Sequence, residues 1–242
     1  MYGMGIWGTY LDEYQGGHDT VLATWEAAEG AGGMYTFGMQ DAFDDLDLDF
    51  DAAYTDFIVR NTVMDYVDQD VIPSVDERGS VDSLPDSDEV DGSSRPQGYG
   101  QTYIRFEAES GSGEGDLVVS FDGDADVPWS VQLVEVTGDA ILRVVVADIV
   151  DGVGTVTLPA FGAEDVVLVA SPLKDGDTKY GFTWSAELVE PVVVEEDTDT
   201  GRDVGGEDDD VEVHAACSSS GADGMLGLGA LVGLAGLVRR RK

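Results

Sequence analysis

The sequence predicts an α+β protein: an N-terminal helical segment, then an antiparallel β-sandwich, a disordered acidic stalk and a short C-terminal transmembrane helix. Three observations predict this order. Apolar residues recur at helical spacing over residues 1–72, whereas from residue 99 they alternate with polar residues, as in half-buried strands. The third observation is the uncharged run Met225–Val238, which is followed only by basic residues.

Charge restricts the possible partners. The 242 residues include 50 acidic and 12 basic ones, giving a net charge of −38, and four of the basic residues are the last four of the chain. A surface of this sign repels phosphate groups, so we expect no nucleic-acid partner. The single cysteine, Cys217, cannot form an intramolecular disulfide, so packing must hold the folded part together.

Four helices are expected in the first 72 residues. Gly16-Gly17 ends the first, and Asp19 or Thr20 can cap the second. A third falls within residues 35–46, and Asp49 or Asp51 opens the fourth. The predicted apolar faces consist of Met4, Trp7, Leu11 and Tyr14; of Val21, Trp25 and Ala28; and of Phe50, Tyr54, Phe57 and Ile58.

Residues 73–98 are rich in Pro, Ser, Asp and Gly, which is typical of an acidic linker. Residues 99–190 then predict about seven strands of a β-sandwich, separated by Gly/Asp turns. Continuous apolar runs at 141–147 and 166–170 indicate strands buried on both faces, and 180–188 alternates most cleanly. Residues 191–216 are acidic and uneven in composition, which fits an extended, disordered stalk.

The sequence holds few candidates for chemistry. His18 and His214 have no partner at metal-ligand spacing, and no nucleophile motif or phosphate loop is present, so no cofactor is expected in this chain. Asp122, Asp124 and Asp126 place three carboxylates at alternating positions, as in calcium-binding loops. A tight turn between two strands explains the same residues, since Asp and Gly favour turns.

The C-terminal tail has the order of parts found in a known kind of signal sequence. Cys217, a Ser/Gly-rich spacer, the apolar run 225–238 and the basic cluster resemble the C-terminal sorting signals of bacterial surface proteins, most closely the MYXO-CTERM type. The resemblance implies that Cys217 is the processing and anchoring point and that a sorting or processing enzyme of the membrane is a partner. The basic cluster consists of Arg239, Arg240, Arg241 and Lys242. We expect it on the cytoplasmic side of the membrane, with the bulk of the chain outside the cell. An ordinary tail anchor is the alternative.

The start of the chain shows no basic region, apolar core or cleavage site of an export signal, so we expect it to be the distal part of a longer exported protein. Its helical part resembles a family of myxobacterial surface metalloproteases, in the segment that follows their zinc site. The matching stretches are Tyr2-Gly3, Trp7, Tyr10–Tyr14, Trp25-Glu26 and Phe57–Asn61. The zinc-binding H-E-x-x-H helix is absent from this sequence, so zinc is implied only for an upstream part and no catalytic residue carries over.

Three functions are compatible with these patterns. The first is the non-catalytic C-terminal region of a surface-anchored, metalloprotease-like protein, in which the sandwich presents or docks substrate. The second is a stand-alone surface protein whose sandwich binds a glycan or another protein. The third is an enzyme of unrecognised type, which lacks support because no nucleophile, metal cluster or positioned base is evident.

Overall fold

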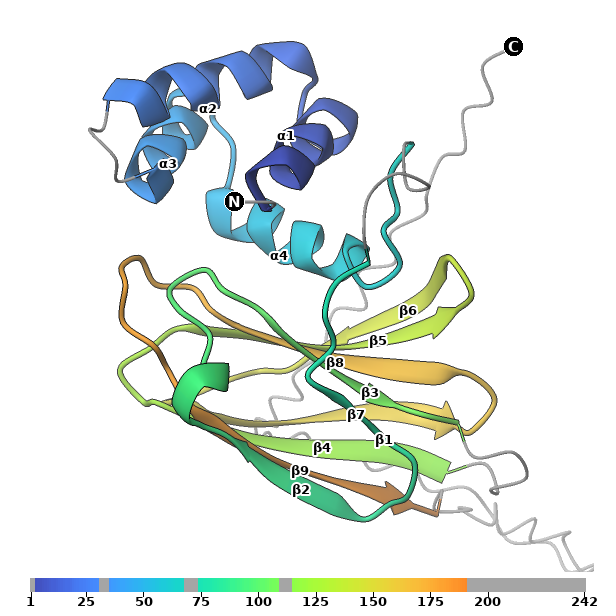
Figure 1. Ribbon diagram of the computed structural model, residues 1–242. Coiled ribbons are helices and arrows are strands. Elements are labelled where there is room, and N and C mark those ends of the chain that lie inside the picture. The colour runs from blue at the N-terminus through green and yellow to red at the C-terminus, as the bar shows by residue number, and fades with distance from the viewer. Residues whose placement is uncertain (1–2, 31–34, 68–73, 109–114, 191–242) are drawn as a thin grey trace, which may run out of the picture. The chain divides into compact units, whose positions relative to one another are not determined.

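The computed structural model describes residues 3–30, 35–67, 74–108 and 115–190, which belong to one compact unit of the chain (Figure 1). Helices come first and strands follow, so the predicted α+β class is confirmed for these residues. The helices are α1 (Gly3–Tyr14), α2 (His18–Gly30), α3 (Tyr35–Asp45) and α4 (Phe50–Arg60). The strands are β1 (Gly79–Val81), β2 (Asp86–Val90), β3 (Thr102–Phe106), β4 (Gly115–Gly123), β5 (Trp129–Thr137), β6 (Ala140–Val146), β7 (Val153–Phe161), β8 (Asp165–Pro172) and β9 (Phe182–Val189).

The strands form two sheets that pack face to face. The five-stranded sheet has the order β1-β3-β8-β5-β6, and the four-stranded sheet has the order β2-β9-β4-β7. All neighbouring strands are antiparallel except β1 and β3, which are parallel. Alternate side chains of both sheets fill a common core, which includes Leu117, Phe121, Leu133, Leu158 and Leu168. Such a core is the defining feature of a β-sandwich.

The helices cover the other face of the five-stranded sheet. Figure 1 shows α4 lying along this sheet, between it and α1–α3. The Tyr103 hydroxyl of β3 donates to the Ile58 carbonyl of α4 at 3.0 Å. One apolar cluster joins helical side chains such as Phe57 to Val134 and Val167 of the sheet. The central strand β8 is therefore buried on both faces, as the apolar run 166–170 predicts.

Helix α4 follows its sequence signals closely. Asp49 is its N-cap and accepts a hydrogen bond from the Ala52 amide at 2.9 Å. The predicted apolar face is buried; its members are Phe50, Tyr54, Phe57 and Ile58. A side-chain acceptor at this position satisfies an amide that has no partner inside the helix.

Replacing Asp49 by alanine is expected to lower the free energy of unfolding by about 1 kcal/mol, because the Ala52 amide loses its acceptor. Asp49→Asn keeps an acceptor and serves as the control. Urea unfolding of the three proteins measures the difference. Equal midpoints for the alanine and asparagine variants would show that the cap contributes nothing.

The expected linker at residues 73–98 is instead part of both sheets. Strand β1 pairs with β3, and β2 pairs with β9. Arg78 also connects the start of β1 to β2, because its Nη2 donates to Asp88 Oδ2 at 2.9 Å and to the Glu89 carbonyl at 2.7 Å. The linker prediction failed because β2 is an edge strand with only Val90 buried, so its acidic sequence carries no apolar alternation.

The apolar run 141–147 also differs from expectation. Most of it forms β6, the edge strand beside β5, and its residues alternate between partly buried and exposed. Leu142, Val144 and Val146 are 52, 39 and 64% exposed. A continuous apolar run thus predicted burial on two faces, but the helices do not cover this edge.

Helix α2 follows its predicted apolar face only in part: Ala28 is buried and Val21 packs on the helical core, but Trp25 does not join them. It starts at His18, and Thr20, Thr24 and Ala28 are its buried residues, whereas Trp25 is 48% exposed. Close packing with α3 explains the choice, because a Cβ on Gly38 of α3 would lie 2.6 Å from the Ala27 carbonyl oxygen. Only small side chains fit where two helix backbones approach this closely.

Candidate functional site

The predicted anchoring residues cannot be placed. Cys217, the stalk 191–216, the transmembrane segment 225–238 and the basic cluster 239–242 all lie outside the described residues. Within the described ranges, no helix combines the length and the apolar character needed to cross a membrane.

The calcium candidate lies at the turn between β4 and β5. Asp122 belongs to β4, Asp124 and Asp126 follow in the turn, and all three are exposed. Asp124 Oδ1 accepts from the Asp126 amide at 3.1 Å, and the Asp124 carbonyl accepts from Trp129 Nε1 at 3.2 Å. The part of the chain that the structure describes contains no group of three or more His, Cys, Asp or Glu that could hold a metal ion. Asp124 therefore stabilises this turn through the hydrogen bonds that it accepts.

The outer face of the four-stranded sheet is exposed in the part of the chain that the structure describes. Pairing places four side chains side by side across all its strands: Ser87 of β2 opposite Ser185 of β9, Ser185 opposite Ser120 of β4, and Ser120 opposite Thr155 of β7. We call these four residues the hydroxyl row. All four are exposed, and Ser120 Oγ lies 3.5 Å from Thr155 Oγ1.

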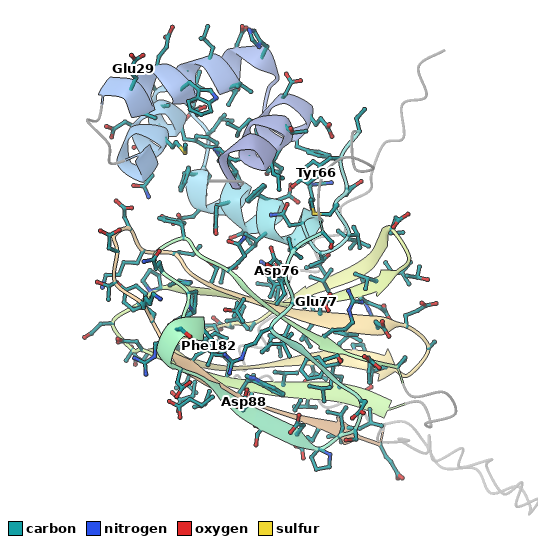
Figure 2. The ribbon with its side chains drawn as sticks, viewed as in Figure 1. Glu29, Tyr66, Asp76, Glu77, Asp88 and Phe182 are labelled. Atoms are coloured by element: carbon teal, nitrogen blue, oxygen red, sulfur yellow. The ribbon has the colours of Figure 1, made fainter. Side chains whose placement is uncertain are left out.

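The three serines of the hydroxyl row line two adjoining grooves, and Thr155 is not part of either lining. One groove of about 520 Å³ is lined by Ser87, Ser120 and Ser185 together with a second row, Glu89, Thr183, Asp122 and Val153. Another of about 390 Å³ shares the three serines and extends towards Pro85 and Glu187. Short side chains leave these hollows because they rise little above the strands. In Figure 2, the labelled residues Asp88 and Phe182 show where β2 and β9, two neighbouring strands of this sheet, lie.

The chemistry available in the grooves is hydrogen bonding and charge attraction. Hydroxyl groups can donate or accept hydrogen bonds, and the carboxyl groups of Glu89, Asp122 and Glu187 offer acceptor oxygens. Among the described residues that line the two grooves there is no histidine, lysine or arginine. The lining residues therefore offer hydrogen bonds and charge attraction for recognising a ligand.

A larger acidic groove of about 850 Å³ lies between α3 and α4 and is lined by Asp41, Asp44, Asp47, Asp49 and Asp51, among others. Two of these carboxylates already have structural partners: Asp49 caps α4, and Asp51 Oδ1 accepts from the Tyr99 hydroxyl at 2.7 Å. The groove is thus in part a by-product of the α4 cap and of the contact between α4 and the Tyr99 loop.

The contact between helices and sheet is built from tyrosines that stay protonated. Burial is the main cause that raises the pKa of Tyr54 and Tyr103 above the ordinary value. The Tyr54 hydroxyl donates to the Tyr99 carbonyl, and Tyr103 donates to Ile58. Tyr66, labelled in Figure 2, donates to Asn61 Oδ1 at 2.6 Å at the end of α4. Tyr103 and Tyr54 thus join α4 to β3 and to the loop before β3, and Tyr66 fixes the end of α4.

Comparison with known proteins gives only distant likenesses. No family model matches the chain, and no curated protein matches it. Among solved structures, the pre-peptidase C-terminal domain of a collagenase from Bacillus anthracis is similar with a TM-score of 0.34 and 9% identity, covering 48% of this chain and 100% of that one. The Yersinia pseudotuberculosis-derived mitogen is similar with a TM-score of 0.29 and 15% identity, and the match covers 48% of this chain and 94% of the mitogen. A family GH115 4-O-methyl-α-glucuronidase is similar with a TM-score of 0.25 and 10% identity, and the match covers 71% of this chain and 28% of the glucuronidase.

Sequence reasoning found part of the open face and missed the rest. The alternation in residues 180–188 assigns Thr183, Ser185 and Glu187 to the side opposite Phe182 and Trp184, which is where they lie. Ser87 cannot be assigned to this face from the sequence, because the acidic composition of its strand is typical of a linker. Its place in the row follows only from pairing with Ser185, about a hundred residues further along the chain.

Proposed function

We propose that this chain is a non-catalytic, surface-held part of a metalloprotease-like protein and that the outer face of its four-stranded sheet docks polypeptide substrate. The observation that carries the proposal is the asymmetry of the sandwich. Helices cover the five-stranded sheet, and the four-stranded sheet keeps an open face with two grooves. Among the described residues, a ligand can therefore approach the outer face of the four-stranded sheet, whereas helices cover most of the five-stranded sheet.

The groove chemistry favours an extended polypeptide with basic side chains. Hydroxyl groups of Ser87, Ser120 and Ser185 can exchange hydrogen bonds with peptide groups. The carboxylates of Glu89, Asp122 and Glu187 stand around them and would attract lysine or arginine. A row of paired hydroxyls also suits the hydroxyl groups of a sugar, and this observation keeps glycan adhesion by a stand-alone protein as the second candidate.

The helical layer supplies the second element of the proposal. Leu22 and Trp25 of α2 are each 48% exposed and lie one helical turn apart. In a metalloprotease-like protein this side of α2 would receive the neighbouring catalytic domain. The helices would then fix the distance between the catalytic centre and the docking face.

Docking is tested with the purified full chain and two probes, denatured casein and dextran. Casein is expected to bind without being cleaved, and the double variant Ser120→Gln/Ser185→Gln is expected to weaken binding at least tenfold, because the larger amides fill the groove without changing the charge. Ser93→Gln, on an exposed residue of the 3-10 helix Gly92–Ser94, is the matched control.

Each outcome bears on one part of the proposal. Casein that fails to bind, or that binds the double variant equally well, refutes docking at this face. Casein cleavage refutes a non-catalytic role. Binding of dextran in place of casein, lost in the double variant, selects glycan adhesion.

Anchoring at Cys217 is proposed separately from docking. The intact mass of the mature protein from membranes tests it: we expect loss of the residues after Cys217 together with an added lipid mass. A full-length C-terminus would contradict processing, and an unchanged location of the Cys217→Ser variant would contradict anchoring by this residue.

A further inference from the structure

The outer face of the four-stranded sheet has a third groove, of about 430 Å³, at the start of β9. It shares Glu89, Asp122 and Thr183 with the groove of about 520 Å³ and continues past them to Arg95 and Lys179. The groove of about 390 Å³ adjoins the other side of the 520 Å³ groove, at the serines of the hydroxyl row. The three hollows therefore follow one another along β9, and we call them together the β9 channel.

Arg95 lies over the outer face of the sheet at this end of the channel. The Tyr180 amide donates to the Pro96 carbonyl at 2.9 Å, so the segment that follows β2 runs beside the start of β9 (Figure 1). Tyr180 and Phe182 belong to the core, so Gly181 between them faces outwards. A Cβ on Gly181 would lie 2.8 Å from Arg95 Nε. The Arg95 guanidinium therefore occupies the space that the missing side chain leaves on the strand.

The two cations of the channel have no acidic partner. Four other arginines of the described residues form ion pairs with carboxylates, namely Arg60, Arg78, Arg105 and Arg143. Arg95 and Lys179 form none with a described residue, although the chain contains 50 acidic residues. A guanidinium presents its N–H donors in a planar fork that matches the two oxygens of a carboxylate. Arg95 is therefore available to a carboxylate of a ligand.

The charges along the channel follow a fixed order. Alternate residues of β9 face outwards, so successive outward positions lie about 7 Å apart. Arg95 makes the first of them positive. Glu89 and Asp122 flank the second, because both pair with Thr183 of β9. The hydroxyl row is the third and carries no charge, and Glu187 makes the fourth negative.

We propose that the β9 channel recognises an extended polypeptide segment of the pattern acid-x-base-x-neutral-x-base. The proposal rests on the docking function proposed above and specifies its substrate. An extended chain has the same repeat as β9, so its alternate side chains meet successive positions of the channel. The acidic side chain pairs with Arg95. The first basic side chain lies between Glu89 and Asp122, and the second contacts Glu187.

A segment with charges of both signs also fits the charge of the whole protein. With a net charge of −38, the chain repels a purely acidic polypeptide, whereas the excess of basic residues in this segment is attracted over a long range. The acidic residue then interacts only at short range, with the cations that face it. The single acid fixes the position of the segment along the channel, and the bases supply the attraction.

Fluorescence anisotropy of labelled, amidated peptides titrated with the full chain tests the spacing. Glu-Ser-Lys-Ser-Ser-Ser-Lys is expected to bind about fivefold more tightly than Glu-Ser-Ser-Lys-Ser-Ser-Lys. The second peptide has the same composition, but its first lysine is moved by one residue and so points away from Glu89 and Asp122. Equal affinities, or no binding of either peptide up to about 1 mM, would contradict the pattern.

A double-mutant cycle tests the pairing of Arg95 with the acid. Arg95→Gln should weaken binding of Glu-Ser-Lys-Ser-Ser-Ser-Lys about fivefold, but should not weaken binding of Gln-Ser-Lys-Ser-Ser-Ser-Lys, because that peptide has no carboxylate to lose. Lys174→Gln removes the same charge at a residue outside the lining of the channel and should bind both peptides as the wild type does. Circular dichroism checks that both variants are folded.

The casein experiment separates this inference from docking itself. If casein binds the wild type and is lost in Ser120→Gln/Ser185→Gln, docking stands. An Arg95→Gln variant that then binds the glutamate peptide as tightly as the wild type overturns the charge pattern alone. Casein that fails to bind overturns docking and the pattern with it.

Discussion

Truncating Phe57 to alanine is expected to lower the free energy of unfolding by about 3–5 kcal/mol, the usual cost of removing a buried phenyl ring. Phe57 is 5% exposed in α4 and packs edge to face on Trp7 of α1, with the ring centroids 5.0 Å apart. A second edge contact, to Tyr10, has a centroid distance of 5.4 Å. No neighbouring side chain can fill the resulting space without giving up its own contacts.

The loss should extend beyond the helices, because Phe57 belongs to the cluster that includes Val134, Val167 and Val169 of the five-stranded sheet. Hydrogen exchange followed by mass spectrometry reads the layers separately. Amides of α4 and of β8 are expected to lose protection together. Leu22→Ala, at a residue that is 48% exposed, is the control and should change stability by less than about 0.5 kcal/mol. A sandwich that keeps its protection while the helices lose theirs would show that the layers fold independently.

Local signals predicted the elements whose structure is decided locally. Helix α4 has its cap at Asp49 and its apolar residues on one face, and both are found as expected. The strand at 180–188 likewise alternates because one face of its sheet is buried and the other is open. In these segments the sequence pattern and the burial have the same cause.

Pairing and packing between distant segments decided the rest. Strand β2 has one buried residue, Val90, and owes its conformation to hydrogen bonding with β9. The buried face of α2 depends on the approach of Gly38, which its own sequence cannot reveal. The hydroxyl row also depends on pairing, since Ser87, Ser120, Thr155 and Ser185 come from four separate strands. Periodicity could indicate that each residue faces outwards, but not that they are neighbours.

Stability is expected to fall steeply as the pH rises above about 10. Tyrosines of the unfolded chain titrate near 10, whereas burial raises the pKa of Tyr54 and Tyr103 in the folded protein above that value. Between the two values the unfolded chain has released protons that the folded chain still binds. The free energy of unfolding therefore decreases with rising pH, by up to about 1.4 kcal/mol per pH unit for each such tyrosine, and is insensitive to these groups below pH 9.

The hydroxyl groups explain why ionisation cannot be tolerated in place. Tyr103 donates to the Ile58 carbonyl and Tyr54 to the Tyr99 carbonyl, and a phenolate has no proton to donate. The variant Tyr54→Phe/Tyr103→Phe removes both titrations. It should be less stable than the wild type at pH 7, by about 1 kcal/mol for each lost hydrogen bond, but lose stability less steeply above pH 10. Urea unfolding from pH 7 to 11 at constant ionic strength measures how the free energy of unfolding changes with pH in the wild type and in the double variant. Parallel slopes would mean that other groups, not these two buried tyrosines, govern the alkaline loss of stability.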